Sequence, residues 1–445
     1  MKIINIASST VIVEIKNIKI LMDPWLVDGE YYGSWYHYPK IDIDKIDLSS
    51  ITHIYLSHIH PDHFSINSFN ILDKNLPVII HNYDAKFLKV NIERLGFKVI
   101  ELDHGEDYNL ALGVTISIFA ADNCNPELCA KFLGCANVET KFKSTQIDSM
   151  AVVSDGEHTL LNTNDCPFEL SKETIKSIFK KYKHIDFLLV GYCGAGPYPQ
   201  CFKLESSFLV KAKEEKMLQF LESGMRFIEE IKPKYFMPFA GTYILSGTLT
   251  QLNENRGIPE LHEALDYYQN LSNKFGSTGV LLNQNEYFNL TTGNQSNPYK
   301  RACSVKRDKY IKNILTKVKF DYQIDDYFTE DSILDLVPKA FDRLIAKKNQ
   351  IGFSTNTKLF IKISKNNDIC LDLIKNFYEI VPCSSYHNTE DYVRIELDNR
   401  LLFRLLSGPK YAHWNNAEIG SHLLFERKPN IFERGLYHIL YFFHS

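Results

Sequence analysis

Apolar residues in the first half of the chain come in short runs, a pattern that is typical of buried β-strands. The runs at 10–15 and 18–22 are separated by Lys16 and Asn17, which predicts a β-hairpin. A second hairpin is predicted around Asp155-Gly156, because Asp-Gly is a strong turn signal between apolar runs. Further strands are predicted at 51–56, 78–80, 98–102, 114–119, 150–154, 159–161, 186–190 and 234–238.

Segments with helical spacing of apolar residues lie between these strands. They cover 68–76, 87–95 and the long amphipathic stretch 211–231. Strands with interspersed helices predict an α/β unit over residues 1–295, built as a sheet sandwich that helices cover.

The polar, turn-rich segment 293–298 predicts a linker. Beyond it, residues 331–348 have a helical pattern, and 358–363 and 392–397 read as strands. We therefore expect a smaller α+β accessory domain over residues 300–445.

The composition narrows the class of protein. The 445 residues are 44% hydrophobic and 23% charged, so a packed core is expected. The formal net charge is −4, and without an excess of basic residues we expect no nucleic-acid partner. No apolar stretch approaches a membrane span and no signal peptide is found, so we expect no membrane partner. Nine unevenly spaced cysteines suggest reduced thiols in a cytoplasm.

The most informative segment follows the predicted strand 51–56. Here His58, His60, Asp62 and His63 fall within six residues. On extended backbone, His58 and His60 point to the same side, and a turn at the intervening proline separates Asp62 and His63 from them. Two imidazoles hold one borderline metal, while the carboxylate and third imidazole hold a second. The spacing predicts a metal site rather than a chance histidine-rich loop.

Such a site needs ligands from other strand ends. Asp165 follows the strand 159–161 and is a candidate for bridging two metals; the alternative is an Asx turn. Asp122 follows the strand 114–119 and is a second candidate, with plain packing of a loop as the alternative. His104 follows the strand 98–102, and we expect either an orienting contact to a ligating histidine or an exposed loop residue.

These residues resemble the metallo-β-lactamase superfamily, whose motif is matched by His58, His60, Asp62 and His63, and whose later bridging carboxylate is matched by Asp165. The resemblance implies a metallo-β-lactamase αβ/βα sandwich with the metals at one sheet edge. Two departures stand out. The family has an imidazole after the strand that here ends at Phe119, where we find Asp122, and another near the last strand, where we find Ala240.

A narrower resemblance is to the CMP-N-acetylneuraminate hydroxylase-like group. It rests on segments 23–26, 31–39, 162–166, 194–202, 238–241 and 413–420. The Rieske domain of that hydroxylase has no counterpart in this sequence, so hydroxylation would require an external electron donor. The C-terminal part resembles a sterol-carrier-type fold. Its segment 412–418 is dense in polar groups, and it either contacts the first domain or substrate, or forms a polar turn over Trp414.

Three functions remain open. The first is a hydrolase acting on an amino-sugar, nucleotide-sugar or similar small metabolite, with one or two zinc or iron ions activating water and Asp62 or Asp165 as catalytic residue. The second is a non-haem iron oxygenase of a similar substrate. The third is a binding protein with a degenerate site. Substrate contacts are expected from Trp25, Trp35, Tyr36, Tyr198 and Gln200, with an aromatic core as the alternative reading.

Overall fold

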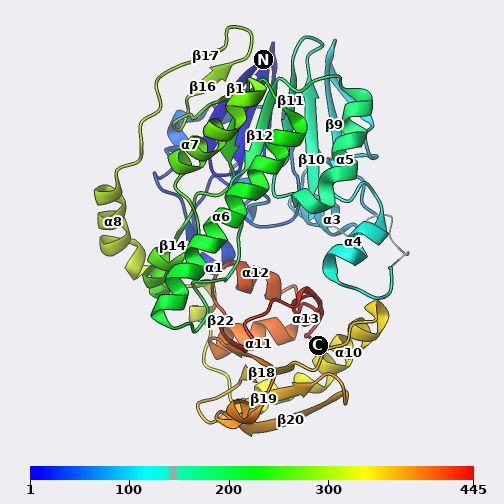
Figure 1. Cartoon of the computed structure of the whole chain (residues 1–445), viewed down its shortest axis with the longest axis vertical. Helices are drawn as coiled ribbons and strands as arrows, with labels where there is room; N and C mark the ends of the chain where they lie inside the picture. The colour runs from blue at the N-terminus through cyan, green and yellow to red at the C-terminus, as the bar shows by residue number, and fades with distance from the viewer. Residues whose placement is uncertain (140, 142–147) are drawn as a thin grey trace.

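The computed structural model of the chain describes residues 1–139, 141 and 148–445. Within these residues two large sheets lie face to face in the upper part of the molecule (Figure 1). The first sheet has the order β17 (Asn294–Gln295), β16 (Tyr287–Asn289), β1 (Lys2–Ala7), β2 (Thr10–Ile15), β3 (Ile18–Met22), β5 (His53–Tyr55), β6 (Val78–His81) and β7 (Val99–Leu102). The second has the order β15 (Thr278–Gly279), β13 (Tyr235–Phe239), β12 (Phe187–Gly191), β11 (Thr159–Asn162), β10 (Ser149–Ser154), β9 (Val114–Ala120) and β8 (Asp107–Ala111).

The alternation of side chains along each strand builds two layers of core. In β2, Val11 and Val13 point between the sheets, whereas Ile12 packs on the outer face of the first sheet. Helix α3 (Phe87–Arg94) covers that outer face through Leu88 and Ile92. The outer face of the second sheet is covered by α5 (Phe168–Lys181), α6 (Ser206–Ile231) and α7 (Leu261–Ser272). The αβ/βα sandwich expected from the sequence is therefore confirmed.

Parallel pairing decides where the site forms. Strands β3, β5, β6 and β7 run parallel, as do β11, β12, β13 and β15. The carboxyl ends of parallel strands lie at one edge of a sheet, so the loops that follow them gather there. In Figure 1 this edge faces the C-terminal part of the chain.

The C-terminal part has its own sheet and core. Its strand order is β20 (Phe377–Pro382), β19 (Asn367–Asp372), β18 (Lys358–Lys362), β21 (Tyr392–Glu396) and β22 (Leu424–Lys428). Apolar side chains of this sheet pack with those of α10 (Val337–Ile351), α11 (Asn399–Ser407) and α13 (Arg434–Leu440).

Two predicted helices differ from the structure. Residues 331–348 form two helices, α9 (Glu330–Leu334) and α10, and Pro338 lies in the first turn of the second, where a missing backbone N–H is tolerated. The helix expected over 68–76 is only the short α2 (Ile66–Phe69). The chain then turns at Asp73, whose carboxylate accepts from the backbone N–H of Asn75.

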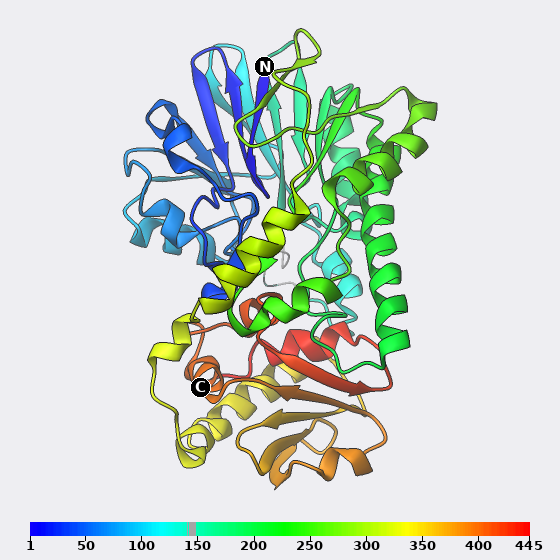
Figure 2. The same ribbon diagram turned by 90° about the vertical axis from the view of Figure 1, so that its left-hand side faces the viewer.

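The two parts of the chain are joined by backbone pairing as well as by sequence. The N–H of Lys203 donates to the carbonyl of Phe425 (2.9 Å), and the N–H of Phe425 donates to the carbonyl of Cys201 (2.8 Å). The ring of Phe202 stacks on that of Phe425 with centroids 4.9 Å apart. The view in Figure 2 shows α8 (Ser304–Asn313) crossing in front of the sandwich between these two parts.

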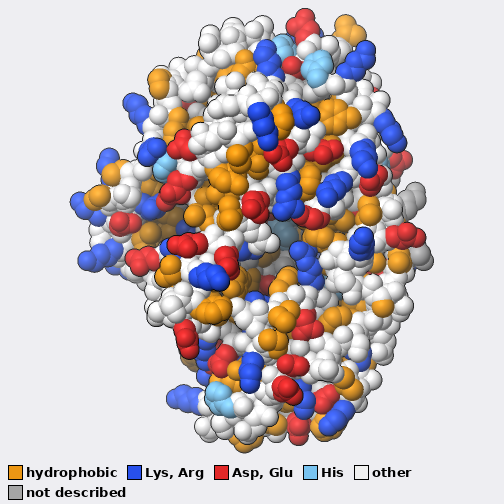
Figure 3. Space-filling view, viewed as in Figure 1, with side chains coloured by type: hydrophobic (Ala, Val, Ile, Leu, Met, Phe, Trp, Pro, Cys, Tyr) orange, Lys and Arg blue, Asp and Glu red, His pale blue; other side chains and the backbone are white. Residues whose placement is uncertain are grey.

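Charged side chains on the face drawn in Figure 3 are mixed, with lysine and arginine beside aspartate and glutamate. This agrees with a formal net charge of only −4. Within the part of the chain that the structure describes, no helix combines the length and the apolar character needed to cross a bilayer.

Candidate metal centre

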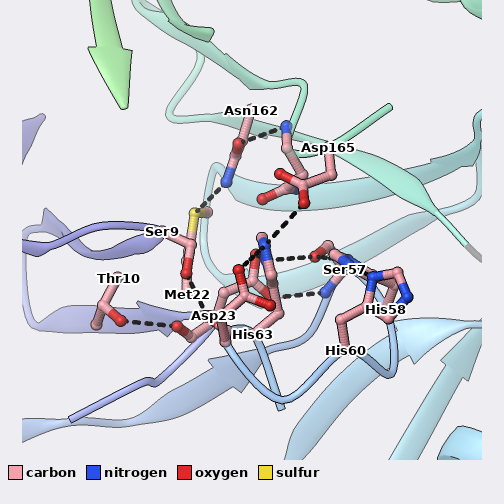
Figure 4. Close-up of polar contacts among 12 residues, drawn as sticks. Ser9, Thr10, Met22, Asp23, Ser57, His58, His60, His63, Asn162 and Asp165 are labelled. Atoms are coloured by element: carbon pink, nitrogen blue, oxygen red, sulfur yellow. Dashed lines mark hydrogen bonds and ion pairs between the residues drawn. The ribbon is translucent and has the colours of Figure 1, made fainter. Parts of the chain in front are cut away.

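The histidine motif lies on the loop that leaves β5, deep at the edge where both sheets end (Figure 4). Ser57 lies near the start of this loop and fixes it: its N–H donates to Oδ1 of Asp23 (2.8 Å), which directly follows β3. The hydroxyl of Ser57 also lies 2.9 Å from Nδ1 of His58 and 3.2 Å from Nδ1 of His63. Both histidines are fully buried, and one serine contacts both imidazoles through their Nδ1 atoms.

His58, His60 and Asp148 form the first cluster, here called the His58 triad. Nε2 of His58 lies 2.9 Å from Nδ1 of His60 and 3.7 Å from Oδ1 of Asp148. Asp148 directly precedes β10, on the opposite sheet from the motif. Sequence reasoning did not identify Asp148, because it lies outside any apolar or motif pattern.

Asp62, His63 and Asp165 form the second cluster, here called the His63 triad. Nε2 of His63 lies 3.4 Å from Oδ2 of Asp165 and 3.6 Å from Oδ2 of Asp62. This buried nitrogen makes no hydrogen bond of normal geometry to any described residue. Asp165 follows β11 on the second sheet, so both triads span the two sheets.

These spacings fit divalent ions. Ligand atoms about 2.1 Å from a common metal stand roughly 3.0–3.5 Å apart at octahedral to tetrahedral angles. The separations in the two triads, 2.9–3.7 Å, are close to that range. The buried Nε2 of His63 faces two carboxylates without a hydrogen bond to a described residue, an arrangement that suits a metal ligand.

The electrostatics agree with this interpretation. Burial, together with the neighbouring His63 and His60, holds the pKa of His58 well below its usual range, so the imidazole is in its neutral, metal-binding form. Burial also disfavours charge on His63, but Asp165, Asp62 and Asp23 outweigh it and raise the pKa of His63. A proton on His63 thus supplies positive charge that a bound divalent ion would supply instead.

Further contacts orient the ligands. Oδ2 of Asp23 lies 3.1 Å from Nδ1 of His63, which leaves Nε2 as the nitrogen facing the carboxylates. The hydroxyl of Tyr31 donates to Oδ1 of Asp62, and the hydroxyl of Ser9 donates to the carbonyl of Asp62 (2.6 Å). Asp23 and Tyr31 were both within segments that the sequence singled out, yet neither position could be assigned this role without the tertiary structure.

The C-terminal part reaches the motif through α12 (Trp414–Ile419). Oδ1 of Asn415 lies 2.8 Å from Nε2 of His60, while its amide donates to the hydroxyl of Tyr441 (3.1 Å). A carbonyl oxygen can only accept, so Nε2 of His60 carries the proton and Nδ1 presents a lone pair toward His58.

Trp414 is itself buried, and its Nε1 donates to the carbonyl of Phe443 (2.8 Å). Segment 412–418 therefore contacts the first part of the chain, as one of the two expectations had it; from Trp414 on it is a helix rather than a polar turn.

Asp122 does not join either triad. It is buried, and its Oδ1 accepts from the N–H of Cys124 (3.1 Å) in the turn after β9. The carboxylate that meets His58 and His60 from this side of the molecule is that of Asp148. His104 likewise contacts Asn123 and Ala120 rather than a histidine of the motif.

Trp25, Trp35 and Tyr36, predicted as substrate contacts, lie in or beside an aromatic core. Trp25 and Trp35 are buried in a cluster with Tyr31, and Trp35 stacks on Tyr243 with centroids 3.4 Å apart. Tyr36, half-buried, pairs in β4 (Trp35–Tyr36) with β14 (Ile244–Leu245). Burial in this core explains the two tryptophans, which support Tyr31 and, through it, Asp62.

Tyr198 and Gln200 lie where the two parts of the chain meet. The Tyr198 ring packs on Phe202, and the Gln200 amide donates to the carbonyl of Gly196 (2.6 Å) and to Ser421 Oγ (3.4 Å). Neither contacts a motif residue. Ala240, at the position where the resemblance implied a last histidine, is buried with φ 53° and donates its N–H to the carbonyl of Ser8.

No family model and no curated protein sequence matches the chain. Solved structures do match about two thirds of it. A possible metal-dependent hydrolase from Veillonella parvula has 14% identity and a TM-score of 0.45, over 65% of this chain and 98% of that one. An isothiocyanate hydrolase from Delia radicum gut bacteria has 14% identity and a TM-score of 0.45, over 65% and 99%. CmlA, a diiron β-hydroxylase from Streptomyces venezuelae, has 13% identity and a TM-score of 0.42, over 64% and 53%.

Proposed function

We propose that the chain is a metal-dependent enzyme of the metallo-β-lactamase fold, and that its two triads hold two divalent ions. The observation that carries this proposal is the convergence of three histidines and three aspartates from both sheets at one buried edge. Idle clusters of this kind would leave buried polar atoms without partners, which disfavours a degenerate binding protein.

Hydrolysis of a small molecule is the reaction that this arrangement supports best, because it needs no electron donor. Divalent metals lower the pKa of bound water to roughly 7, which supplies hydroxide at neutral pH. The Asp165 side chain is 27% exposed, against 10% for Asp62 and 9% for Asp148, so Asp165 is the carboxylate that an entering water reaches. We assign the proton-accepting role to Asp165, and to Asp62 the role of a ligand that Tyr31 holds in place.

One observation favours oxygen chemistry as a second candidate. The His58 triad consists of two imidazoles and one carboxylate, the set that non-haem iron oxygenases use. Such a reaction also needs electrons, which a separate protein donor would bring. The resemblance to the CMP-N-acetylneuraminate hydroxylase-like group also supports an oxygenase that takes electrons from a separate donor.

The substrate we propose is a small anionic metabolite such as a nucleotide-sugar or amino-sugar. A cavity of about 1050 Å³ beyond the carboxyl end of β13 is lined among others by Ser8, His37, Ala240 and Arg256, and by no residue of the two triads. Nε of Arg256 and Nε2 of the buried His37 have no hydrogen-bond partner among the described residues. An anionic group would pair with Arg256 there, and the small side chain of Ala240 leaves room for it.

Metal analysis combined with oxygen uptake separates the two reactions. The protein is purified without added metal, its iron, zinc and manganese are measured, and the iron form is reduced and offered oxygen with candidate substrates. Bound metal without oxygen uptake under any reductant supports the hydrolase. Tight iron with substrate-triggered oxygen uptake supports the oxygenase instead, and absence of bound metal contradicts both.

A further inference from the structure

His81 at the end of β6 is buried, and no described residue is a polar partner of its ring. Its exposed fraction is 3%, and neither Nδ1 nor Nε2 has a hydrogen-bond partner among the described residues. Buried polar groups are nearly always paired, and an imidazole with two unpaired nitrogens is therefore unusual. Burial, with a smaller contribution from His104, lowers the pKa of His81 to about 3, so the ring is neutral and offers a lone pair.

Two further metal-binding side chains lie beside His81. One nitrogen each of His81 and His104, together with Sγ of Cys124, lie within 4.8 Å of one another. His81 is the last residue of β6, while His104 and Cys124 follow β7 and β9, so the cluster depends on the tertiary structure. Within this set, here called the thiol triad, Cys124 is placed by a tight turn in which Asn123 and Cys124 both have φ 54°.

His104 is already oriented by its own loop. The N–H of Ala120 donates to its Nδ1 (3.1 Å), so Nε2 carries the proton and donates to Oδ1 of Asn123 (3.1 Å). The hydroxyl of Ser177 donates to the same Asn123 oxygen at 2.8 Å. Asn123 therefore keeps a hydrogen bond if His104 exchanges one of its contacts for a metal.

We propose that His81, His104 and Cys124 bind a zinc-class divalent ion at a site separate from the two triads of the candidate metal centre. Thiolate and imidazole are the ligands that such borderline ions prefer. Cys124 releases its thiol proton to solvent on binding, and closure from 4.8 Å to metal-bound spacing needs only small shifts of the three side chains. Three protein ligands leave a fourth position for water.

One tyrosine, Tyr83, connects the thiol triad with the His58 triad. The ring of Tyr83 packs against His81 with centroids 4.3 Å apart, and its hydroxyl donates to the carbonyl of Asp148 (2.7 Å). An ion on His81 would therefore stiffen the segment that carries a ligand of the main centre.

Cobalt spectroscopy tests the thiol triad alone. The His58 and His63 triads contain only nitrogen and oxygen donors, so cobalt there gives no thiolate-to-metal charge-transfer band. Metal-free protein titrated with Co²⁺ is expected to develop this near-ultraviolet band, saturating at one ion. Cys124→Ser should abolish the charge-transfer band. His81→Ala should weaken the affinity of the thiol triad for Co²⁺ by roughly 100-fold or more.

The control is Cys193→Ser. The charges of Asp165 and Asp62 act on the Cys193 thiol, so this cysteine belongs to the surroundings of the main centre and not to the thiol triad. The band is expected to be unchanged in that variant. Circular dichroism shows whether each variant is folded, and Cys124→Ser alters a single atom. A folded wild-type protein that shows no thiolate band, or a band that survives Cys124→Ser, overturns the proposal whether or not the main centre binds metal.

Discussion

Asn415 and His60, 355 positions apart in the sequence, lie in direct contact, with Asn415 Oδ1 2.8 Å from His60 Nε2. The contact makes the C-terminal part a component of the metal centre, because it fixes which nitrogen of His60 faces His58. The same amide is held by Tyr441, whose hydroxyl donates to Oε2 of Glu418 (3.0 Å). Three side chains of the C-terminal part therefore determine the orientation of one ligand.

Asn415→Ala should weaken metal binding without unfolding the protein. Loss of a group that orients a ligating histidine typically costs about 10–100-fold in metal affinity. Asn415→Asp keeps an acceptor oxygen in the same place and is the matched control. Competition with a chromophoric chelator measures both affinities, and equal affinities of wild type and Asn415→Ala would contradict the role given to this contact.

Asp148→Ala should remove one ion from the centre. The variant leaves His58 and His60 without the carboxylate that completes their triad, so metal stoichiometry measured by mass spectrometry is expected to fall by one equivalent. Asp44→Ala, which changes an exposed aspartate in the short 3-10 helix Ile43–Lys45, serves as the control. Full stoichiometry in the Asp148 variant would assign the third ligand to another residue.

The sequence predicted much of the fold because its strands carry strong local signals. The hairpin at 10–15 and 18–22 is β2 and β3 to the residue, and Asp155-Gly156 is the turn between β10 and β11. The motif was predicted from its spacing at a strand end, and Asp165 from its place after a strand together with the family resemblance; that they are ligands stays a prediction. Asp148 and Asn415 were not predicted, since each acquires its place only when distant segments meet. The ligand role expected of Asp122 stays a prediction; in the structure its Oδ1 accepts from the N–H of Cys124.

Tyr31→Phe should impair the centre through Asp62. The phenol donates to Oδ1 of Asp62, and without it this buried carboxylate loses a hydrogen bond that holds it toward His63. We expect metal affinity or turnover to fall by roughly tenfold. Tyr411→Phe, at an exposed tyrosine, should leave both values unchanged. A Tyr31→Phe protein that matches wild type in both measurements would show that this hydrogen bond does not position Asp62.

Glu418 should make stability depend on pH. Burial raises the pKa of Glu418 to about 7, whereas the unfolded chain ionises near its ordinary value of about 4.3. The folded state therefore binds the extra proton between these values. The stability that this group contributes is fully present below about pH 4, falls as pH rises toward 7, and is lost above it.

The whole change amounts to about 4 kcal/mol at most. Urea unfolding of the metal-free protein at pH 5 and pH 8 measures it, with Glu418→Gln as the reference that cannot ionise. The difference in unfolding free energy between wild type and Glu418→Gln should shift against wild type at pH 8. A difference that is the same at both pH values would mean that Glu418 does not titrate in this range.

Metal content of the centre itself tests the central claim most directly. The measurement compares bound metal per chain in the wild type and in a His58→Ala/His63→Ala double variant, both purified identically and shown to be folded. Each substitution removes a histidine from a different triad, so we expect the double variant to hold two fewer ions than the wild type. Equal metal content in the two proteins would contradict the metal centre.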